Sequence, residues 1–152
     1  MAKTIAELEG VAHRHAAAED EGDLAGTLAT LEAEPVYELY PVGLKMTGLP
    51  LARRYYEHFF ARVAPRIAGY EMLGEWVNEL GVLQEYRVAV RCDDDRVRDF
   101  RIMGLLKFGD TALAGERLYA DTEFLRILFE PLWDELEACG DAPAGTPAEH
   151  RR

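Results

Sequence analysis

The sequence predicts an α+β domain in which helices cover one face of a curved antiparallel sheet. Two observations support this fold class. Helical patterns open the 152-residue chain and return at residues 47–63, and after Pro65 the hydrophobic period changes to that of strands. The resulting order is two helices, a short strand, a helix and four strands, which is typical of α+β proteins.

The first two expected helices each begin at a capping residue. Residues 4–20 form the first, because Thr4 and Glu7 have the spacing of a capping box. Asp23 then caps a second helix, expected over residues 24–34, whose leucines recur on one face.

A strand and a third helix follow. The stretch "PVYELYPVG", residues 35–43, is typical of a short strand bounded by prolines. Residues 47–63 have a helical pattern, and Pro50 falls in the first turn, where proline is tolerated. We expect one strand and one helix here.

Four strand-like segments follow Pro65. Gly81, an acidic run and a Gly-Asp pair provide the turn signals between them. Consecutive strands with short turns predict an antiparallel meander, with strands at 68–79, 81–92, 97–108 and 111–120.

The last part of the chain is expected to be helical and then disordered. A helix follows from Asp121, Pro131 breaks or kinks it, and "LWDELEA" resumes as a further helical turn. We expect a single domain over residues 1–138 and a disordered tail over residues 139–152.

Charge and composition exclude several classes of partner. The net charge of −11 argues against binding to nucleic acid or to an anionic membrane surface, since both need basic residues. No apolar run is long enough to span a bilayer, and the first residues lack a signal-peptide core. Cys92 and Cys139 form no metal-type spacing with each other or with the histidines. We expect a cytoplasmic protein without a metal or cofactor.

Four segments carry a resemblance to a known superfamily, in this order: "GDLAGTLATL", "YELYPVGLKMTGLPLARRYYE", "FRIMGLLKFGD" and "GERLYADTEFLRIL". Their order and spacing resemble the nuclear transport factor 2-like superfamily, in its SnoaL-like polyketide cyclase branch. Ketosteroid isomerases and limonene-epoxide hydrolases are related to it. The resemblance implies a cone-shaped sheet wrapped around the helices, one deep apolar pocket and a homodimer formed through the outer sheet face.

The resemblance also implies that two catalytic positions are altered. Enzymes of the epoxide-hydrolase and cyclase type have a pocket aspartate near the position of Leu118, and an asparagine where this chain has Leu39. Tyr37 matches the tyrosine that helps such enzymes to hold a water molecule. Without the acid and the amide, water activation of the epoxide-hydrolase type is not expected.

Glu116 is the candidate that could replace the missing acid. Strand alternation puts Glu116, Leu118 and Ala120 on one face, which we expect to be the concave one. The neighbouring Asp121 is interpreted as the cap of the following helix, and Tyr119 as a half-buried packing residue.

The first helix offers a second candidate pair. His15 takes a position that is often aromatic and pocket-facing in the superfamily, and Glu19 follows on the same helix face. A carboxylate beside a histidine raises its basicity and orients it, so the pair could act as a base. The alternative is that both side chains are exposed on an alanine-rich, charged helix.

The remaining expected pocket residues come from the strands. They are Tyr37, Trp76, Asn78, Tyr86, Met103 and Leu118. Around Met103 the apolar period is ambiguous, because both faces of that segment carry apolar residues.

Two functional hypotheses remain. One is an enzyme of the cyclase, isomerase or hydratase kind that transfers protons on a small, mostly apolar, oxygenated substrate. His15, Glu19 or Glu116 would act as base, and Tyr37 or Tyr86 would donate a hydrogen bond. The other is a non-catalytic binding or interaction domain with the same pocket.

Overall fold

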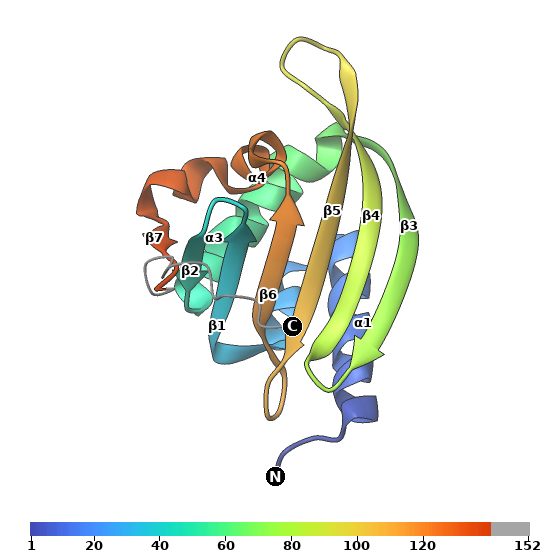
Figure 1. Cartoon of the computed structure of the whole chain (residues 1–152), viewed down its shortest axis with the longest axis vertical. Coiled ribbons are helices and arrows are strands. Elements are labelled where there is room, and N and C mark those ends of the chain that lie inside the picture. The colour runs from blue at the N-terminus through green and yellow to red at the C-terminus, as the bar shows by residue number, and fades with distance from the viewer. Residues whose placement is uncertain (141–152) are drawn as a thin grey trace, which may run out of the picture.

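The computed structural model describes residues 1–140 of the chain. In these residues one sheet curves around helices that lie on its inner face (Figure 1). The elements in chain order are α1 (Ile5–Glu21), α2 (Leu24–Ala29), β1 (Leu31–Tyr40), β2 (Leu44–Thr47), α3 (Leu49–His58), a π-helical turn (Phe59–Val63), a 3₁₀ turn (Ala64–Arg66), β3 (Ile67–Asn78), β4 (Gly81–Arg91), β5 (Val97–Phe108), β6 (Leu113–Ala120), α4 (Thr122–Phe129), a second 3₁₀ segment (Glu130–Glu135) and β7 (Glu137–Ala138).

The expected helix starts are confirmed. Thr4 and Glu7 form a reciprocal capping box at the start of α1, and the Asp23 side chain accepts a hydrogen bond from the Gly26 N–H. Between the two helices Gly22 adopts a left-handed conformation (φ 69°), which glycine reaches without steric cost. These local signals therefore fix the joint between α1 and α2.

The second helix is shorter than expected. We predicted it over residues 24–34, but α2 ends at Ala29 and β1 begins at Leu31. The Thr30 hydroxyl donates to the Thr27 carbonyl, and the Thr30 carbonyl accepts from Leu113 of β6. Pairing with a distant strand thus overrides the helical preference of the stretch after Thr30.

The expected strand at residues 35–43 is part of a hairpin. β1 runs from Leu31 to Tyr40, and the chain reverses into β2, which pairs antiparallel with it. Gly43 has a positive φ of 67° in the turn, again a conformation that favours glycine.

The third helix changes its winding before it ends. Residues 49–58 are α-helical with Pro50 in the first turn, as expected, and residues 59–63 form a π-helical turn. Such π-turns are rare and are often found at functional sites. Here the turn carries Phe59, which faces the cavity described below.

The sheet has seven strands in the order β3-β4-β5-β6-β1-β2-β7. The meander predicted over residues 68–120 is confirmed as β3 to β6, all antiparallel. The sheet is not wholly antiparallel, however, because β1 pairs parallel with β6. The α+β class and the curved sheet wrapped around N-terminal helices are confirmed.

The end of the described chain differs from expectation in detail. The helix at Asp121 is confirmed as α4, which ends at Phe129. Pro131 breaks the α-helix, which was one of the two alternatives, and the expected further helical turn is the 3₁₀ segment Glu130–Glu135. The chain then adds the short strand β7 to the edge of the sheet, and the Cys139 N–H donates to the Gly43 carbonyl. Of the tail expected to be disordered, residues 141–152 lie outside the described residues.

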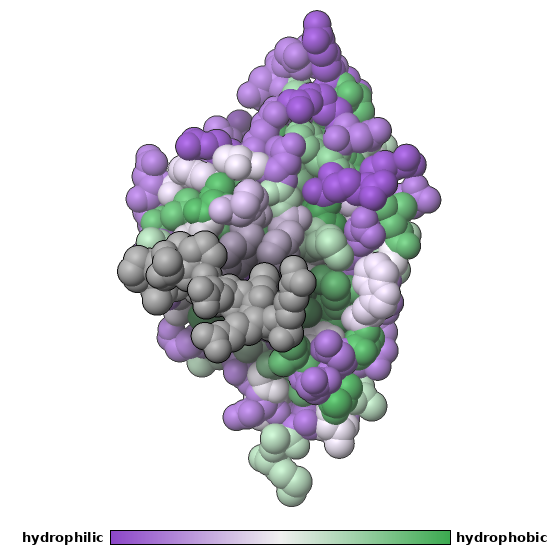
Figure 2. Space-filling view, in the orientation of Figure 1, coloured by the Kyte–Doolittle hydropathy of each residue, from purple (hydrophilic) through white to green (hydrophobic). Residues whose placement is uncertain are grey.

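The core lies between the helices and the concave face of the sheet. Its largest fully buried side chains include Tyr37, Leu39, Tyr56, Leu113 and Phe129. The opposite, outer face is mostly hydrophilic with hydrophobic residues between (Figure 2). Within residues 1–140, no helix has the length and apolar character needed to cross a membrane.

Candidate active site

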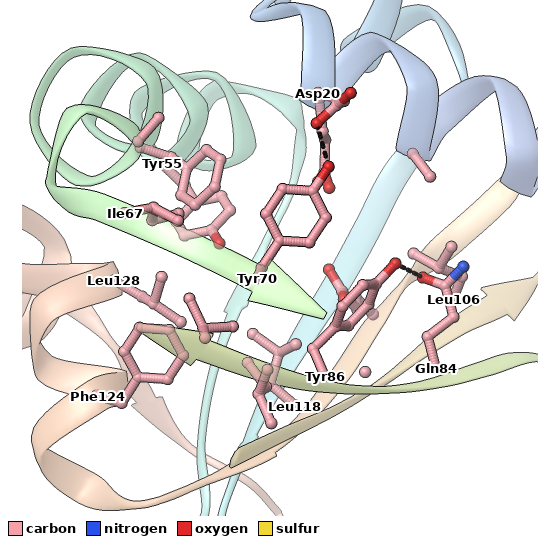
Figure 3. Close-up of a pocket in the computed structure, with 18 of the residues that line it drawn as sticks. Asp20, Tyr55, Ile67, Tyr70, Gln84, Tyr86, Leu106, Leu118, Phe124 and Leu128 are labelled. Atoms are coloured by element: carbon pink, nitrogen blue, oxygen red, sulfur yellow. Dashed lines mark hydrogen bonds between the residues drawn. The ribbon is translucent and has the colours of Figure 1, made fainter. Parts of the chain in front are cut away.

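A cavity of about 430 Å³ lies between α1, the end of α3 and the concave face of the sheet (Figure 3). Its walls are mainly apolar, and polar groups enter from α1, α3, β3, β4 and β6. The apolar lining includes Phe59, Ile67, Val88, Ile102, Leu106, Leu118, Phe124 and Leu128; the polar lining is Glu19, Asp20, Tyr55, Tyr70, Gln84, Tyr86 and Glu116. An apolar hollow with a few convergent polar groups is the usual form of a small-molecule site.

Glu116 lies on the concave face of β6 and lines this cavity. Burial and the negative charge of Glu19 raise the pKa of the Glu116 carboxyl well above its ordinary value. No described residue forms a hydrogen bond with the Glu116 side chain. A raised pKa favours the protonated carboxyl group, which can donate a hydrogen bond to a ligand.

Room for the Glu116 carboxyl depends on Gly104 of the neighbouring strand β5. A Cβ atom built on Gly104 would lie only 2.7 Å from Glu116 Oε1. Glu116 therefore extends into the space that a side chain at position 104 would fill.

His15 and Glu19 form the pair that the sequence suggested. His15 is fully buried, and its Nε2 lies 3.1 Å from Glu19 Oε1. Glu19 is partly exposed and lines the cavity, whereas His15 lies behind it. The alternative that both side chains are exposed is thereby excluded for His15.

The position of the proton on the His15 ring follows from its contact with Thr30. The Thr30 hydroxyl donates its single proton to the Thr27 carbonyl, at 2.6 Å, so toward His15 it can only accept. His15 Nδ1, at 2.6 Å from that hydroxyl, therefore carries a proton. This leaves Nε2 facing Glu19 and the Tyr56 hydroxyl.

Two buried tyrosines continue this network. The Tyr56 hydroxyl is 3.0 Å from His15 Nε2 and 2.8 Å from the Tyr37 hydroxyl. Burial raises the pKa of both phenols well above 10, so they remain neutral. Tyr37 was expected on the pocket wall, but it lies behind Tyr55 and Tyr56 and does not line the cavity.

A second polar chain connects the cavity with the surface. The Tyr86 hydroxyl donates to Gln84 Oε1, Gln84 Nε2 donates to Glu75, and Glu75 pairs with His13. Burial, together with the charge of nearby carboxylates, raises the pKa of Tyr86 to about 12. Tyr86 lines the cavity as expected, held in place by the buried amide of Gln84.

Trp76 and Asn78 were expected on the pocket wall but lie outside the cavity. Trp76 is 53% exposed, and the Asn78 side chain accepts from the Leu80 N–H in the β3–β4 turn. The reason is a register shift in β3, between Met72 and Gly74. An extra residue reverses the alternation of side chains beyond it, so that Glu75 and not Trp76 reaches Gln84.

Of the two other expected wall residues, Leu118 faces the cavity and Met103 does not. Leu118 lines the cavity, as expected from its alternation with Glu116. Met103 does not, because Ile102, Gly104 and Leu106 are the β5 residues that face inward. Both faces of this stretch are apolar, so its alternation in the sequence could not decide between them.

Asp121 and Tyr119 have the structural roles given to them. The Asp121 side chain accepts hydrogen bonds from the N–H groups of Glu123 and Phe124 at the start of α4. Tyr119 stacks on Tyr40, with ring centroids 5.3 Å apart, and lies half-exposed outside the cavity. Neither residue contributes to the site.

The sequence analysis missed Asp20 and Tyr70. Tyr70 projects from β3 and donates to Asp20 Oδ1 at 2.6 Å, which links β3 to the end of α1 (Figure 3). The two residues are 50 positions apart in the sequence, so no local pattern in either segment could predict their contact. Among residues 1–140, no cluster of three or more His, Cys, Asp or Glu side chains could hold a metal ion.

Solved structures of other proteins share this fold. An NTF2-like protein of unknown function from Cytophaga hutchinsonii matches with a TM-score of 0.62 and 10% identity, over 75% of this chain and 99% of its own. An LEH-like epoxide hydrolase from M. tuberculosis matches at 0.60 and 19% identity, over 86% and 95%. A candidate isomerase from Bacillus subtilis matches at 0.61 and 13% identity, over 84% and 96%. The fold is therefore that of nuclear transport factor 2-like proteins. No protein-family model matches the chain, and no curated protein matches it by sequence.

Proposed function

We propose that this protein is an enzyme that transfers a proton on a small, mostly apolar, oxygenated substrate, as isomerases and cyclases do. The observation that carries the proposal is that two of the three carboxyl groups lining the cavity, Glu19 and Glu116, lie in different environments. Glu19 pairs with His15, whereas Glu116 lines the cavity without a hydrogen-bond or ion-pair partner among the described residues. Because burial raises the pKa of Glu116, Glu116 can serve as the acid while the other carboxyl group serves as the base.

Glu19 is the base in this proposal. Its Oε1 faces His15, and no described residue hydrogen-bonds its Oε2, which is available to a substrate. Glu19 takes a proton from a carbon next to a carbonyl group and returns it to another carbon of the same molecule. His15 orients Glu19 and is itself held by Thr30 and Tyr56.

Glu116 is the acid. Its protonated carboxyl donates a hydrogen bond to the carbonyl oxygen of the substrate, where negative charge develops as Glu19 removes the proton. The apolar walls favour this arrangement, since electrostatic interactions are stronger where water is excluded. No atom is added to or lost from the substrate, so the reaction is an isomerisation.

Exchange of carbon-bound hydrogen for deuterium tests the proposal. Small enolisable ketones are incubated with the protein in D₂O, and exchange is followed by NMR. We expect Glu19→Gln and Glu116→Gln each to slow exchange by about 100-fold or more, because positioned acid–base groups typically contribute this much. Glu130→Gln, an exposed carboxyl away from the cavity, is the matched control and should exchange at the wild-type rate.

A non-catalytic binding domain is the second candidate. It is favoured by Leu39 and Leu118, which are apolar and buried and stand where the superfamily resemblance implies polar catalytic residues. If no ketone exchanges faster with the wild-type protein than with Glu19→Gln, the enzyme proposal is wrong and this candidate replaces it.

We also propose that the protein is a homodimer that buries part of the outer sheet face. Exposed hydrophobic residues on this part of the sheet support the proposal, among them Tyr119 and Val97. The superfamily resemblance points to the same face. A dimer would cover these side chains without blocking the cavity, which opens on the other face of the sheet.

A cytoplasmic location is proposed as well. Cys92 and Cys139 are both free thiols in the structure, and unpaired cysteines are usual in a reducing compartment. Fractionation of cells that produce the protein would test this proposal.

A further inference from the structure

The charged side chains that line the cavity all carry the same sign. They are Glu19 and Asp20, and no lysine, arginine or histidine among the described residues lines it. The third carboxyl group of the lining, that of Glu116, has a raised pKa that favours its neutral form. His15 pairs with Glu19 from behind, but neither Asp20 nor Glu116 forms an ion pair with any residue in 1–140. The cavity therefore offers negative charge that the protein itself does not balance.

Two tyrosine rings stand beside this charge. Tyr70 and Tyr86 meet at 67° with ring centroids 6.1 Å apart, and the Tyr70 hydroxyl donates to Asp20. Figure 3 shows the Tyr70 hydroxyl directed at Asp20 and the Tyr86 hydroxyl directed at Gln84. Aromatic faces attract cations within about 6 Å of the ring centroid, and a carboxylate beside them adds to that attraction.

We propose that the cavity binds a small organic cation, namely a protonated amine carried on an apolar skeleton. The ammonium group lies beside Asp20 and the rings of Tyr70 and Tyr86. The skeleton packs against the apolar wall that includes Phe124 and Leu128, which Figure 3 places away from Gln84. An anionic ligand of the same shape is repelled by the lining.

This inference deepens the proposed function and rests on it only for turnover. The substrate would carry an oxygen for Glu116 as well as an amine for Asp20, but binding of an amine does not require proton transfer. The net charge of −11 also favours the approach of cations over that of anions.

Binding of three matched compounds tests the inference. They are 4-phenylbutylamine, 4-phenylbutan-1-ol and 4-phenylbutanoate, measured with the whole protein by isothermal titration calorimetry at pH 7. We expect the amine to bind at least about 10-fold more tightly than the alcohol, and the carboxylate not to bind. Equal or tighter binding of the alcohol or the carboxylate overturns the inference, as does an amine that fails to bind.

Two charge-matched variants locate the effect. Asp20→Asn should lower the preference for the amine over the alcohol by about 10-fold. Asp134→Asn removes the same charge at an exposed position outside the cavity and should leave the preference unchanged. If both variants lost the preference for the amine equally, the preference would come from the overall charge of the protein, and the assigned site would be wrong.

Variants of Tyr70 separate its ring from its hydroxyl. Tyr70→Leu should weaken amine binding, whereas Tyr70→Phe keeps the ring and should retain most of it. Equal binding by both variants would exclude a role for the ring. Selective amine binding without deuterium exchange would refute the proposed reaction and leave this inference standing.

Discussion

Glu116 is a carboxyl group whose neutral form the folded chain favours. It lies deep in an apolar cavity, beside the charge of Glu19 and without a hydrogen-bond partner among the described residues. A group of this kind costs stability whenever it must ionise. Its presence is therefore better explained by a ligand than by the needs of folding.

This cost predicts a pH dependence of stability. The folded-state pKa of Glu116 lies above the ordinary 4.5, so its favourable contribution is complete below the unfolded pKa and is lost as the pH rises through the folded pKa. Glu116→Gln removes this loss. Thermal melts should show the variant gaining melting temperature relative to wild type from pH 4.5 upward. Parallel curves for the two proteins would contradict the assigned burial.

Gly104→Ala is expected to affect activity more than stability. The new Cβ would lie only 2.7 Å from Glu116 Oε1, which is too close. The Glu116 carboxyl group can move aside, because it is the end of a flexible side chain. We expect the deuterium exchange rate to fall about 10-fold or more, since a small misplacement of an acid is costly. The melting temperature should change little. Unchanged exchange would mean that the position of Glu116 is unimportant.

Asp121→Ala separates a capping role from a catalytic one. The side chain accepts from two N–H groups of α4, and loss of an N-cap costs about 1 kcal/mol. Denaturant melts should show this loss, while ligand binding and exchange stay at the wild-type level. If Asp121→Ala had normal stability but no deuterium exchange, Asp121 would have a catalytic role after all.

At the scale of elements, the irregularities of the strands decide what faces the cavity. The register shift in β3 between Met72 and Gly74 turns Trp76 outward and brings Glu75 to Gln84. The parallel pairing of β1 with β6 likewise places Tyr37 next to Glu116. Such shifts change which residues share a face without changing the strand itself.

Gly115 is required by the pairing of β1 with β6. Its φ is 120°, and a Cβ there would lie 2.0 Å from the Val36 carbonyl oxygen. We expect Gly115→Ala to destabilise the protein by about 3 kcal/mol or more, because rigid backbone cannot move aside. Chemical denaturation measures the change. Gly69→Ala, which meets no atom within 4 Å, is the control and should cost little.

At the scale of the whole molecule, the two faces of the sheet have different roles. The concave face builds the core and the cavity, while the outer face carries ion pairs such as Arg87–Glu71 and Arg101–Glu85. Hydrophobic side chains are exposed between such pairs. A partner on the outer face would cover them and leave the cavity in use.

Sedimentation velocity tests the proposed dimer. At micromolar concentration we expect the wild-type protein to sediment as a dimer, and Tyr119→Glu to shift it toward monomer by placing a charge on the outer face. Leu80→Glu adds the same charge in the β3–β4 turn and should remain dimeric. A monomer at all concentrations would refute the proposal.

The sequence by itself determined the elements whose causes are local. Thr4 with Glu7, Asp23 and Asp121 mark helix starts through side-chain hydrogen bonds that span only a few residues, and Gly22 ends α1 in a left-handed conformation. The meander could also be predicted, because strand alternation and turn residues lie next to each other in the chain. Glu116 was found in the same way, since its alternation with Leu118 continues without interruption to the end of β6.

Only the tertiary structure decided the contents of the cavity. Strand pairing with β6 ended α2 at Ala29, and the register shift in β3 excluded Trp76. The contact of Asp20 with Tyr70 joins segments that are far apart in the chain. These features depend on non-local hydrogen bonds and packing, whose free energies outweigh local preferences and leave no pattern in a single segment of sequence.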